Sequence, residues 1–77
     1  MKDSIQIYVS LLDEGTDVWR PVEAVHVRDD MYRIISSNLN PKDERWQFVS
    51  GDVVRCQSHV FADGSQGMVA YEIVGEV

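Results

Sequence analysis

The chain has 77 residues, of which 13 are acidic and 7 are basic, so its formal charge at pH 7 is -6. A chain of this length can build one hydrophobic core, so we expect a single domain over residues 1–77. The acidic excess disfavours a nucleic acid partner, because phosphate is itself anionic. No segment approaches the roughly 20 apolar residues of a membrane-spanning helix, so no membrane partner is expected. The one cysteine cannot form an internal disulfide, which is typical of the reducing cytoplasm.

The clearest pattern in the chain is the alternation of apolar and polar residues over residues 4–12, which predicts a strand and argues against a secretory leader. Turn-forming residues at 13–17 then lead into a second predicted strand, residues 18–28. Pro21 must lie at a bulge, a corner or an edge of this strand, because proline has no N–H to donate. The apolar residues that would share one face of the first strand are Ile5, Ile7, Val9 and Leu11.

The middle of the chain predicts a hairpin, a short helical turn and a fourth strand. Asp29-Asp30 form a tight turn into residues 31–35, which would pair with the second strand. Asparagine before Pro41 and acidic residues after it are typical of a helix N-terminus, so we expect one helical turn over residues 41–45. Residues 46–49 predict a strand whose tryptophan and phenylalanine face the core.

The last part of the chain predicts two more strands. In residues 53–61, Cys56 falls on the same face as Val54 and Val60, so we expect it to be buried and unreactive. A glycine-containing turn leads to the last predicted strand, residues 68–74. The residues expected to share one face of that strand are Val69, Tyr71 and Ile73.

Six short strands with tight turns predict an all-β fold, a small six-stranded antiparallel barrel of the SH3-like kind with one short helical turn near Pro41. An open sheet of six strands would need a cover for its apolar face, and no long helix is predicted that could supply one. The alternative is a five-stranded OB-like barrel, which would usually have a longer helix between its strands.

Four segments carry a resemblance to known proteins: LLDEGTDVWRPV at residues 11–22, YRI at 32–34, ERWQF at 44–48 and GDVVRC at 51–56. Together they resemble a group of small bacterial proteins that carry the LLDEGTDVWRPV motif. The resemblance implies an SH3-like barrel. Because such short proteins are often carried on mobile DNA, it also implies an accessory or inhibitory role, but it assigns no activity and no binding residues.

No pattern in the sequence predicts a catalytic or metal site. The spacing of the acids at 13, 14 and 17 does not match the calcium loop of an EF-hand, which favours a solvated turn. Cys56 and His59 are three residues apart in a predicted strand, so their side chains point to opposite faces and cannot bind one metal. We therefore expect no cofactor, no metal and no enzymatic activity.

Arginines interleaved with aromatic residues could suit base stacking by an RNA-binding barrel. They do not cluster in the sequence, however, and acids outnumber them, so pairing with acids across strands is the simpler interpretation. The arginines concerned are Arg28, Arg33, Arg45 and Arg55, and the aromatic residues are Tyr32 and Trp46.

The acidic turn and the tryptophan after it are the best candidates for a functional surface. Trp19 next to Arg20 is the usual composition of a binding hot spot, but a tryptophan can equally close one end of a small barrel. The sequence leaves these two interpretations open. The residues that we predict to contact a partner are Asp13, Glu14, Asp17, Trp19 and Arg20.

The function that the sequence favours is a non-enzymatic protein-binding module, an adaptor or inhibitor of a bacterial complex. An acidic mimic of nucleic acid is an alternative that requires the acids on one face. A ligand-binding or catalytic barrel is another, and requires a deep polar pocket with perturbed carboxylates. A homodimer is also expected, because several apolar residues fall outside the main alternating face. These are Tyr8, Leu12, Val25 or Val27, and Ile35.

Overall fold

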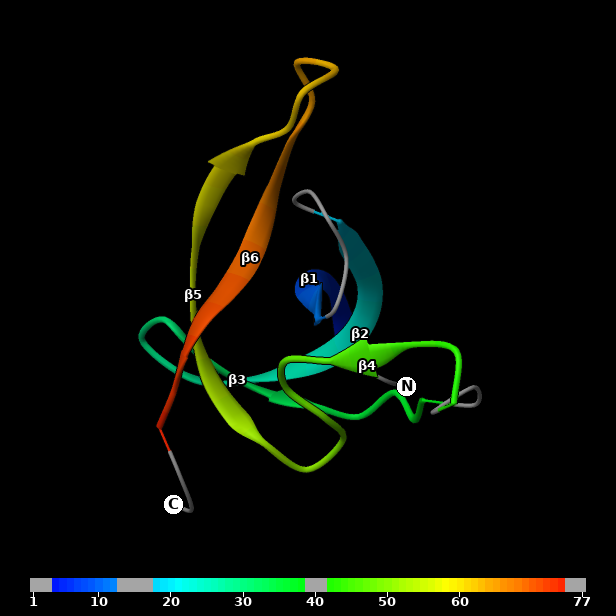
Figure 1. Ribbon diagram of the computed structural model, residues 1–77. Coiled ribbons are helices and arrows are strands. Elements are labelled where there is room, and N and C mark those ends of the chain that lie inside the picture. Colours follow the sequence, from blue (N-terminus) through cyan, green and yellow to red (C-terminus); the bar gives the residue numbers. More distant parts are fainter. Residues whose placement is uncertain (1–3, 13–17, 39–41, 75–77) are drawn as a thin grey trace.

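The structure is a computed structural model that describes residues 4–12, 18–38 and 42–74. These residues contain strands and turns and no helix (Figure 1). Lys42 and Asp43 form a turn, while Pro41, where the helical turn was expected, lies outside the described residues. The predicted all-β class and the six strands of a small barrel are confirmed. The strands are β1 (Ser4–Leu12), β2 (Trp19–Arg28), β3 (Met31–Ile34), β4 (Arg45–Trp46), β5 (Val53–Val60) and β6 (Gln66–Ile73).

Five of the strands close into a ring in the order β1, β2, β3, β5, β6 and back to β1. Every contact round this ring is antiparallel except that of β1 with β6, which is parallel and pairs Tyr8 with Val69. This follows from the odd number of strands, because neighbours that alternate in direction cannot close such a ring without one parallel contact. The sheet is therefore mixed, where the sequence predicted an antiparallel one.

The first strand has three neighbours. Its residues from Ser4 to Ser10 pair with β2, and its last two residues pair with the short β4. Ile7 and Val9 are fully buried, as the alternation predicted. Ile5 belongs to the same alternating set but is 40% exposed, so the buried face of β1 begins at Ile7, two residues later than expected.

Backbone constraints in β2 are met as the sequence predicted. Pro21 pairs with Tyr8 on β1, and pairing of β2 with β3 begins only at Ala24. The proline therefore lies where β2 has a strand on one side only, which is the edge position expected of a proline in a sheet. At the end of β2, Asp29-Asp30 form the expected turn into β3, with Asp29 at a φ of 49°, a conformation that aspartate tolerates better than most residues.

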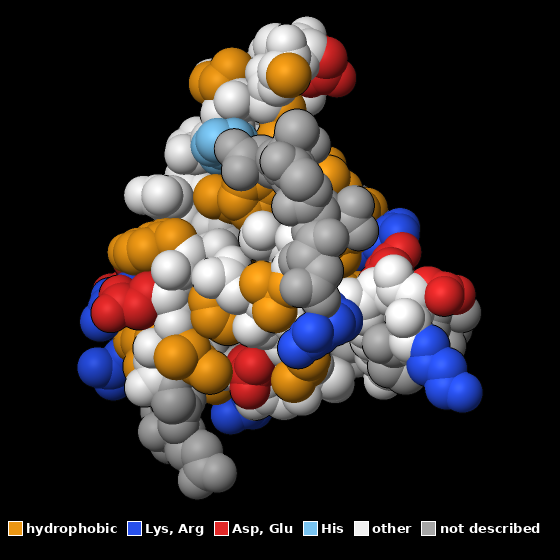
Figure 2. All heavy atoms as spheres, viewed as in Figure 1, with side chains coloured by type: hydrophobic (Ala, Val, Ile, Leu, Met, Phe, Trp, Pro, Cys, Tyr) orange, Lys and Arg blue, Asp and Glu red, His pale blue; other side chains and the backbone are white. Residues whose placement is uncertain are grey.

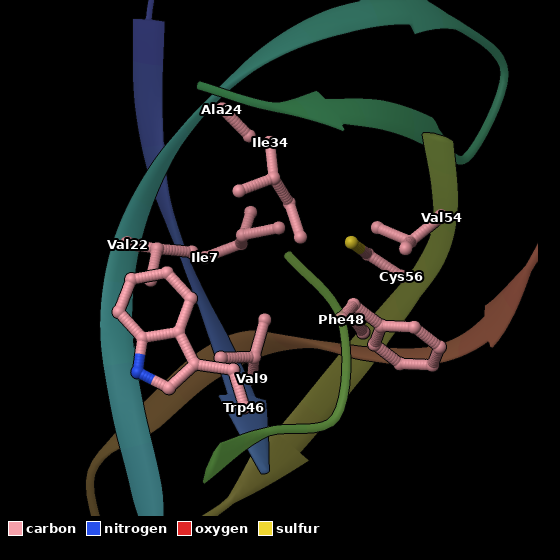
Figure 3. Close-up of a cluster of buried hydrophobic side chains, with 10 residues drawn as sticks. Ile7, Val9, Val22, Ala24, Ile34, Trp46, Phe48, Val54 and Cys56 are labelled. Carbon is pink, nitrogen blue, oxygen red and sulfur yellow. The ribbon is translucent and has the colours of Figure 1, made fainter. Parts of the chain in front are cut away.

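The core lies inside the ring, and its residues come from every strand (Figure 3). Trp46 and Phe48 both face it, as predicted, although β4 itself ends at Trp46. The sulfur of Cys56 points into the cluster, and the residue is 3% exposed, so its predicted burial is confirmed (Figure 3). The core cluster comprises Ile7, Val9, Val22, Ala24, Ile34, Trp46, Phe48, Val54, Cys56 and Ala70.

The expected alternation along β6 is wrong because of a β-bulge. Arg55 pairs with Glu72 but Cys56 pairs with Ala70, so Tyr71 is an extra residue between two consecutive pairs. One extra residue reverses the side to which the following side chains point. Ala70 accordingly joins the core, and Tyr71 is 43% exposed.

The predicted core position of Val60 is also wrong, because the β5–β6 hairpin extends beyond the ring (Figure 1). Val60 is 57% exposed at the end of β5, where no opposite strand covers it. The hairpin tip thus stands clear of the barrel. Its inner side faces the start of β2 and the middle of β1.

Candidate binding groove

The structure separates the residues that the sequence grouped into one partner-binding surface. Asp13, Glu14 and Asp17 lie outside the described residues. Trp19 and Arg20 are successive residues of β2, and successive side chains of a strand point to opposite faces. The two side chains therefore belong to different surroundings.

Arg20 is held in a hydrogen-bonded cluster around Glu44. Its guanidinium forms a two-pronged ion pair with this carboxylate, in which Nε lies 3.0 Å from Oε1. The indole Nε1–H of Trp46 donates to the same oxygen at 3.0 Å. The hydrogen bond from Trp46 and the ion pair with Arg20 hold the pKa of Glu44 below its ordinary value. Arg20 thus ties β2 to the segment that carries the core tryptophan.

Trp19 belongs to a second set of contacts, which we call the aromatic cluster: Tyr8, Trp19, His59 and Phe61. Phe61 is its centre, with ring centroids 4.8 Å from Tyr8, 5.0 Å from His59 and 6.2 Å from Trp19. Trp19 also lies 5.3 Å from His59. All four side chains are partly exposed and none belongs to the core cluster. Trp19 is therefore neither an isolated surface anchor nor a plug of the barrel.

A glycine in β6 makes the close approach of these rings possible. Gly67 pairs with His59 across the hairpin. A Cβ atom added to Gly67 would lie 2.8 Å from Cε1 of Tyr8 and 2.9 Å from Cε2 of Phe61. Both distances are shorter than real Cβ contacts, so the two rings occupy the space that any other residue would need. The absence of a side chain at Gly67 thus allows the close packing of the aromatic cluster.

The aromatic cluster lines an open groove of about 730 Å³ between the start of β2 and the tip of the β5–β6 hairpin. Hydrophobic side chains gather below the hairpin tip in the space-filling view (Figure 2). The volume falls within the roughly 300–1,000 Å³ of small-ligand pockets, but the groove is open along one side. The other lining residues are Val18, Val60, Ala62, Asp63 and Ser65.

The rim of the groove carries a fixed negative charge at Asp63. Its Oδ1 accepts hydrogen bonds from the hydroxyl of Ser65 at 2.7 Å and from the backbone N–H of Ser65 at 3.0 Å. These hydrogen bonds lower the pKa of the Asp63 carboxyl. Among the described residues that line the groove there is no lysine or arginine. The charge that the groove presents is therefore anionic.

Two further ionic contacts join Arg55 of β5 to the β2–β3 turn and to β6. Arg55 pairs with Asp30 at 3.0 Å and with Glu72 at 3.6 Å. Acidic side chains lie beside basic ones over the visible face and do not gather in one area (Figure 2). Such a distribution gives no support to an acidic mimic of nucleic acid, at least on the part of the chain that the structure describes.

The described residues offer neither a metal site nor a membrane-spanning helix. Within residues 4–12, 18–38 and 42–74, no group of three or more histidine, cysteine, aspartate or glutamate residues is arranged to hold a metal ion. The same residues contain no helix long and apolar enough to span a membrane. The carboxylates with resolved pKa shifts, Glu44 and Asp63, are both shifted downward, so they are better anions and poorer proton donors.

Sequence reasoning singled out only Trp19 of the aromatic cluster. It placed Tyr8 outside the main face of the first strand and assigned it to self-association, and it considered His59 as a metal ligand together with Cys56. The available signal was that aromatic residues occur at outward positions in two strands. Which of them meet depends on the pairing of β1 with β6, which the sequence did not predict.

Comparisons with protein families, with curated proteins and with solved structures find no match to this chain. The resemblance to small bacterial proteins thus stays a prediction.

Proposed function

We propose that the protein is a non-enzymatic protein-binding module, acting as an adaptor or inhibitor, and that a segment of its partner binds in the groove lined by the aromatic cluster. The observation that carries this proposal is the position of the four rings. They are partly exposed, they lie outside the core, and they line one open groove. Partly exposed aromatic side chains that cluster in a concave surface are the usual centre of a protein interface.

The shape of the groove favours a peptide segment as its occupant. A volume of about 730 Å³ holds several side chains, and the open side would let a polypeptide enter and leave the groove without threading. The rings hold one another by edge contacts, so little conformational entropy would be lost on binding. A site that is already ordered before binding can bind tightly even when the contact area is small.

The other residues predicted at the surface take different parts in this proposal. Asp13, Glu14 and Asp17 precede the groove residue Val18 in the chain, and their contact with a partner stays a prediction. Arg20 would contribute indirectly, through the ion pair with Glu44 that fixes β2 next to the groove. The pKa values of Glu44 and Asp63 are both lowered, so the two carboxylates keep their negative charge over a wider pH range.

The proposal can be tested with a displayed library of random peptides. Peptides selected on the wild-type protein should lose binding to Trp19→Ala and to His59→Ala, and should retain it with Val49→Ala. Val49 is 47% exposed and does not line the groove, so it is a matched control for loss of an exposed apolar side chain. Each variant is first checked for a native circular dichroism spectrum. Peptides that bind Trp19→Ala and His59→Ala as well as the wild type would show that the groove is not the binding site.

A further inference from the structure

We propose that the groove selects partner segments that carry a lysine or arginine side chain, whose cationic group rests against the rings of the aromatic cluster and faces Asp63. This inference rests on the proposed function and specifies its ligand class. It combines three observations: four aromatic side chains that line one groove, one hydrogen-bonded carboxylate at its rim, and no lysine or arginine among the described lining residues.

The geometry of the rings suits a cation. The interplanar angles are 61° between Tyr8 and Phe61, 68° between Trp19 and Phe61, and 50° between Trp19 and His59. None of these pairs is stacked in parallel, so the rings do not cover one another's faces completely. The face of an aromatic ring is the negative part of its quadrupole and attracts ammonium and guanidinium groups. Rings inclined to one another can present several such faces to one cation.

The electrostatic setting favours the same ligand. Asp63 is the only carboxylate among the described lining residues, and its two hydrogen bonds from Ser65 fix its orientation. In the part of the lining that the structure describes, no arginine or lysine neutralises it. The chain as a whole carries a formal charge of -6, which attracts a basic segment over a longer range. An acidic or purely apolar segment would lack this attraction.

The test uses two small probes, N-acetyl-lysine N-methylamide and its norleucine counterpart, which has a similar chain without the ammonium group. Both are titrated into the protein, and binding is followed by the NMR resonances of Trp19 and Phe61. The lysine probe should bind about two- to fivefold more tightly, and added sodium chloride should reduce the difference. Asp63→Asn, which keeps the oxygen that accepts from Ser65, should remove most of the difference. Glu72→Gln, at the other end of β6, is the control for an equal change in net charge and should leave it intact.

The outcomes separate this inference from the proposed function. If the norleucine probe binds as tightly as the lysine probe, or if Asp63→Asn has no more effect than Glu72→Gln, the cationic preference is wrong while the groove stays a binding site. If neither probe moves the resonances of the aromatic cluster, the inference is likewise overturned. In a peptide selection on the wild type, enrichment of lysine and arginine that is lost on Asp63→Asn supports it. Selected peptides without that enrichment contradict it even where they bind in the groove.

Discussion

Replacement of Gly67 by alanine tests whether the aromatic cluster is built as closely as the structure shows. Alanine in the middle of a strand normally gains about 0.5–1 kcal/mol over glycine, because the unfolded chain loses freedom. At this position the new methyl group would lie 2.8 Å from the Tyr8 ring and 2.9 Å from the Phe61 ring. Both rings must then move, and overpacking of this kind costs about 1–3 kcal/mol. We expect the clash to exceed the gain, so Gly67→Ala should lower the free energy of unfolding by about 1–2 kcal/mol.

Thermal unfolding followed by circular dichroism measures this effect, since each kcal/mol shifts the melting temperature by about 4–8 °C in a domain of this size. Gly64→Ala is the matched control, because Gly64 has a φ of 90° but no atom within 4 Å of an added Cβ. It should lose stability through backbone strain and leave the NMR resonances of Tyr8 and Phe61 unchanged. Gly67→Ala should shift those resonances. If it is instead as stable as the wild type and leaves the rings undisturbed, the close packing of the aromatic cluster is incorrect.

Three further predictions concern the core and its surroundings. Burial raises the pKa of the Cys56 thiol from 9.0 to about 11, so thiol labelling at pH 8 should be at least about 100-fold slower in the native protein than in urea. The folded protein favours the neutral thiol, so this group contributes fully to the free energy of unfolding below pH 9 and loses that contribution as the pH rises toward 11. Alkaline denaturation would reveal the loss. The pKa of Glu44 is lowered from 4.5, so its ionised form stabilises the fold above that pH and this stabilisation is lost on acidification. In urea titrations, the difference in the free energy of unfolding between the wild type and Glu44→Gln should therefore shrink below pH 4.5. Trp46→Ala should cost about 3–5 kcal/mol because Trp46 is in the core, whereas Trp19→Ala should cost about 1–2 kcal/mol from its ring contacts; equal losses would mean that Trp19 is also a core residue.

The parts of the fold that follow from local patterns could be predicted from the sequence. Alternation in β1 identified Ile7 and Val9 as buried, and the Asp29-Asp30 turn located the β2–β3 hairpin. The bulge at Tyr71 could not be predicted, because it carries neither the glycine nor the proline that commonly marks such a position. The parallel contact of β1 with β6 depends on how the whole ring closes, and local patterns contain no information on it.

The candidate site was predicted less well, for a related reason. Trp19 attracted attention through its immediate neighbours in the chain, and these neighbours turn out to have separate roles. Arg20 pairs with Glu44 on one side of β2, while Trp19 meets the rings of His59 and Phe61, at the end of β5, on the other. A binding surface assembled from distant segments has no contiguous motif. Its residues can be recognised only after strand pairing places them together.

The parallel contact between Tyr8 and Val69 also bears on how the protein folds. The two residues are separated by most of the chain, so this contact has a large entropic cost of loop closure. The β2–β3 and β5–β6 hairpins can form early from neighbouring residues, on the microsecond timescale of isolated hairpins. The ring can close only afterwards, and β1 and β6 present unpaired edges until it does. We therefore expect the last step of folding to bring Tyr8 against Phe61, so that the groove and the barrel are completed together.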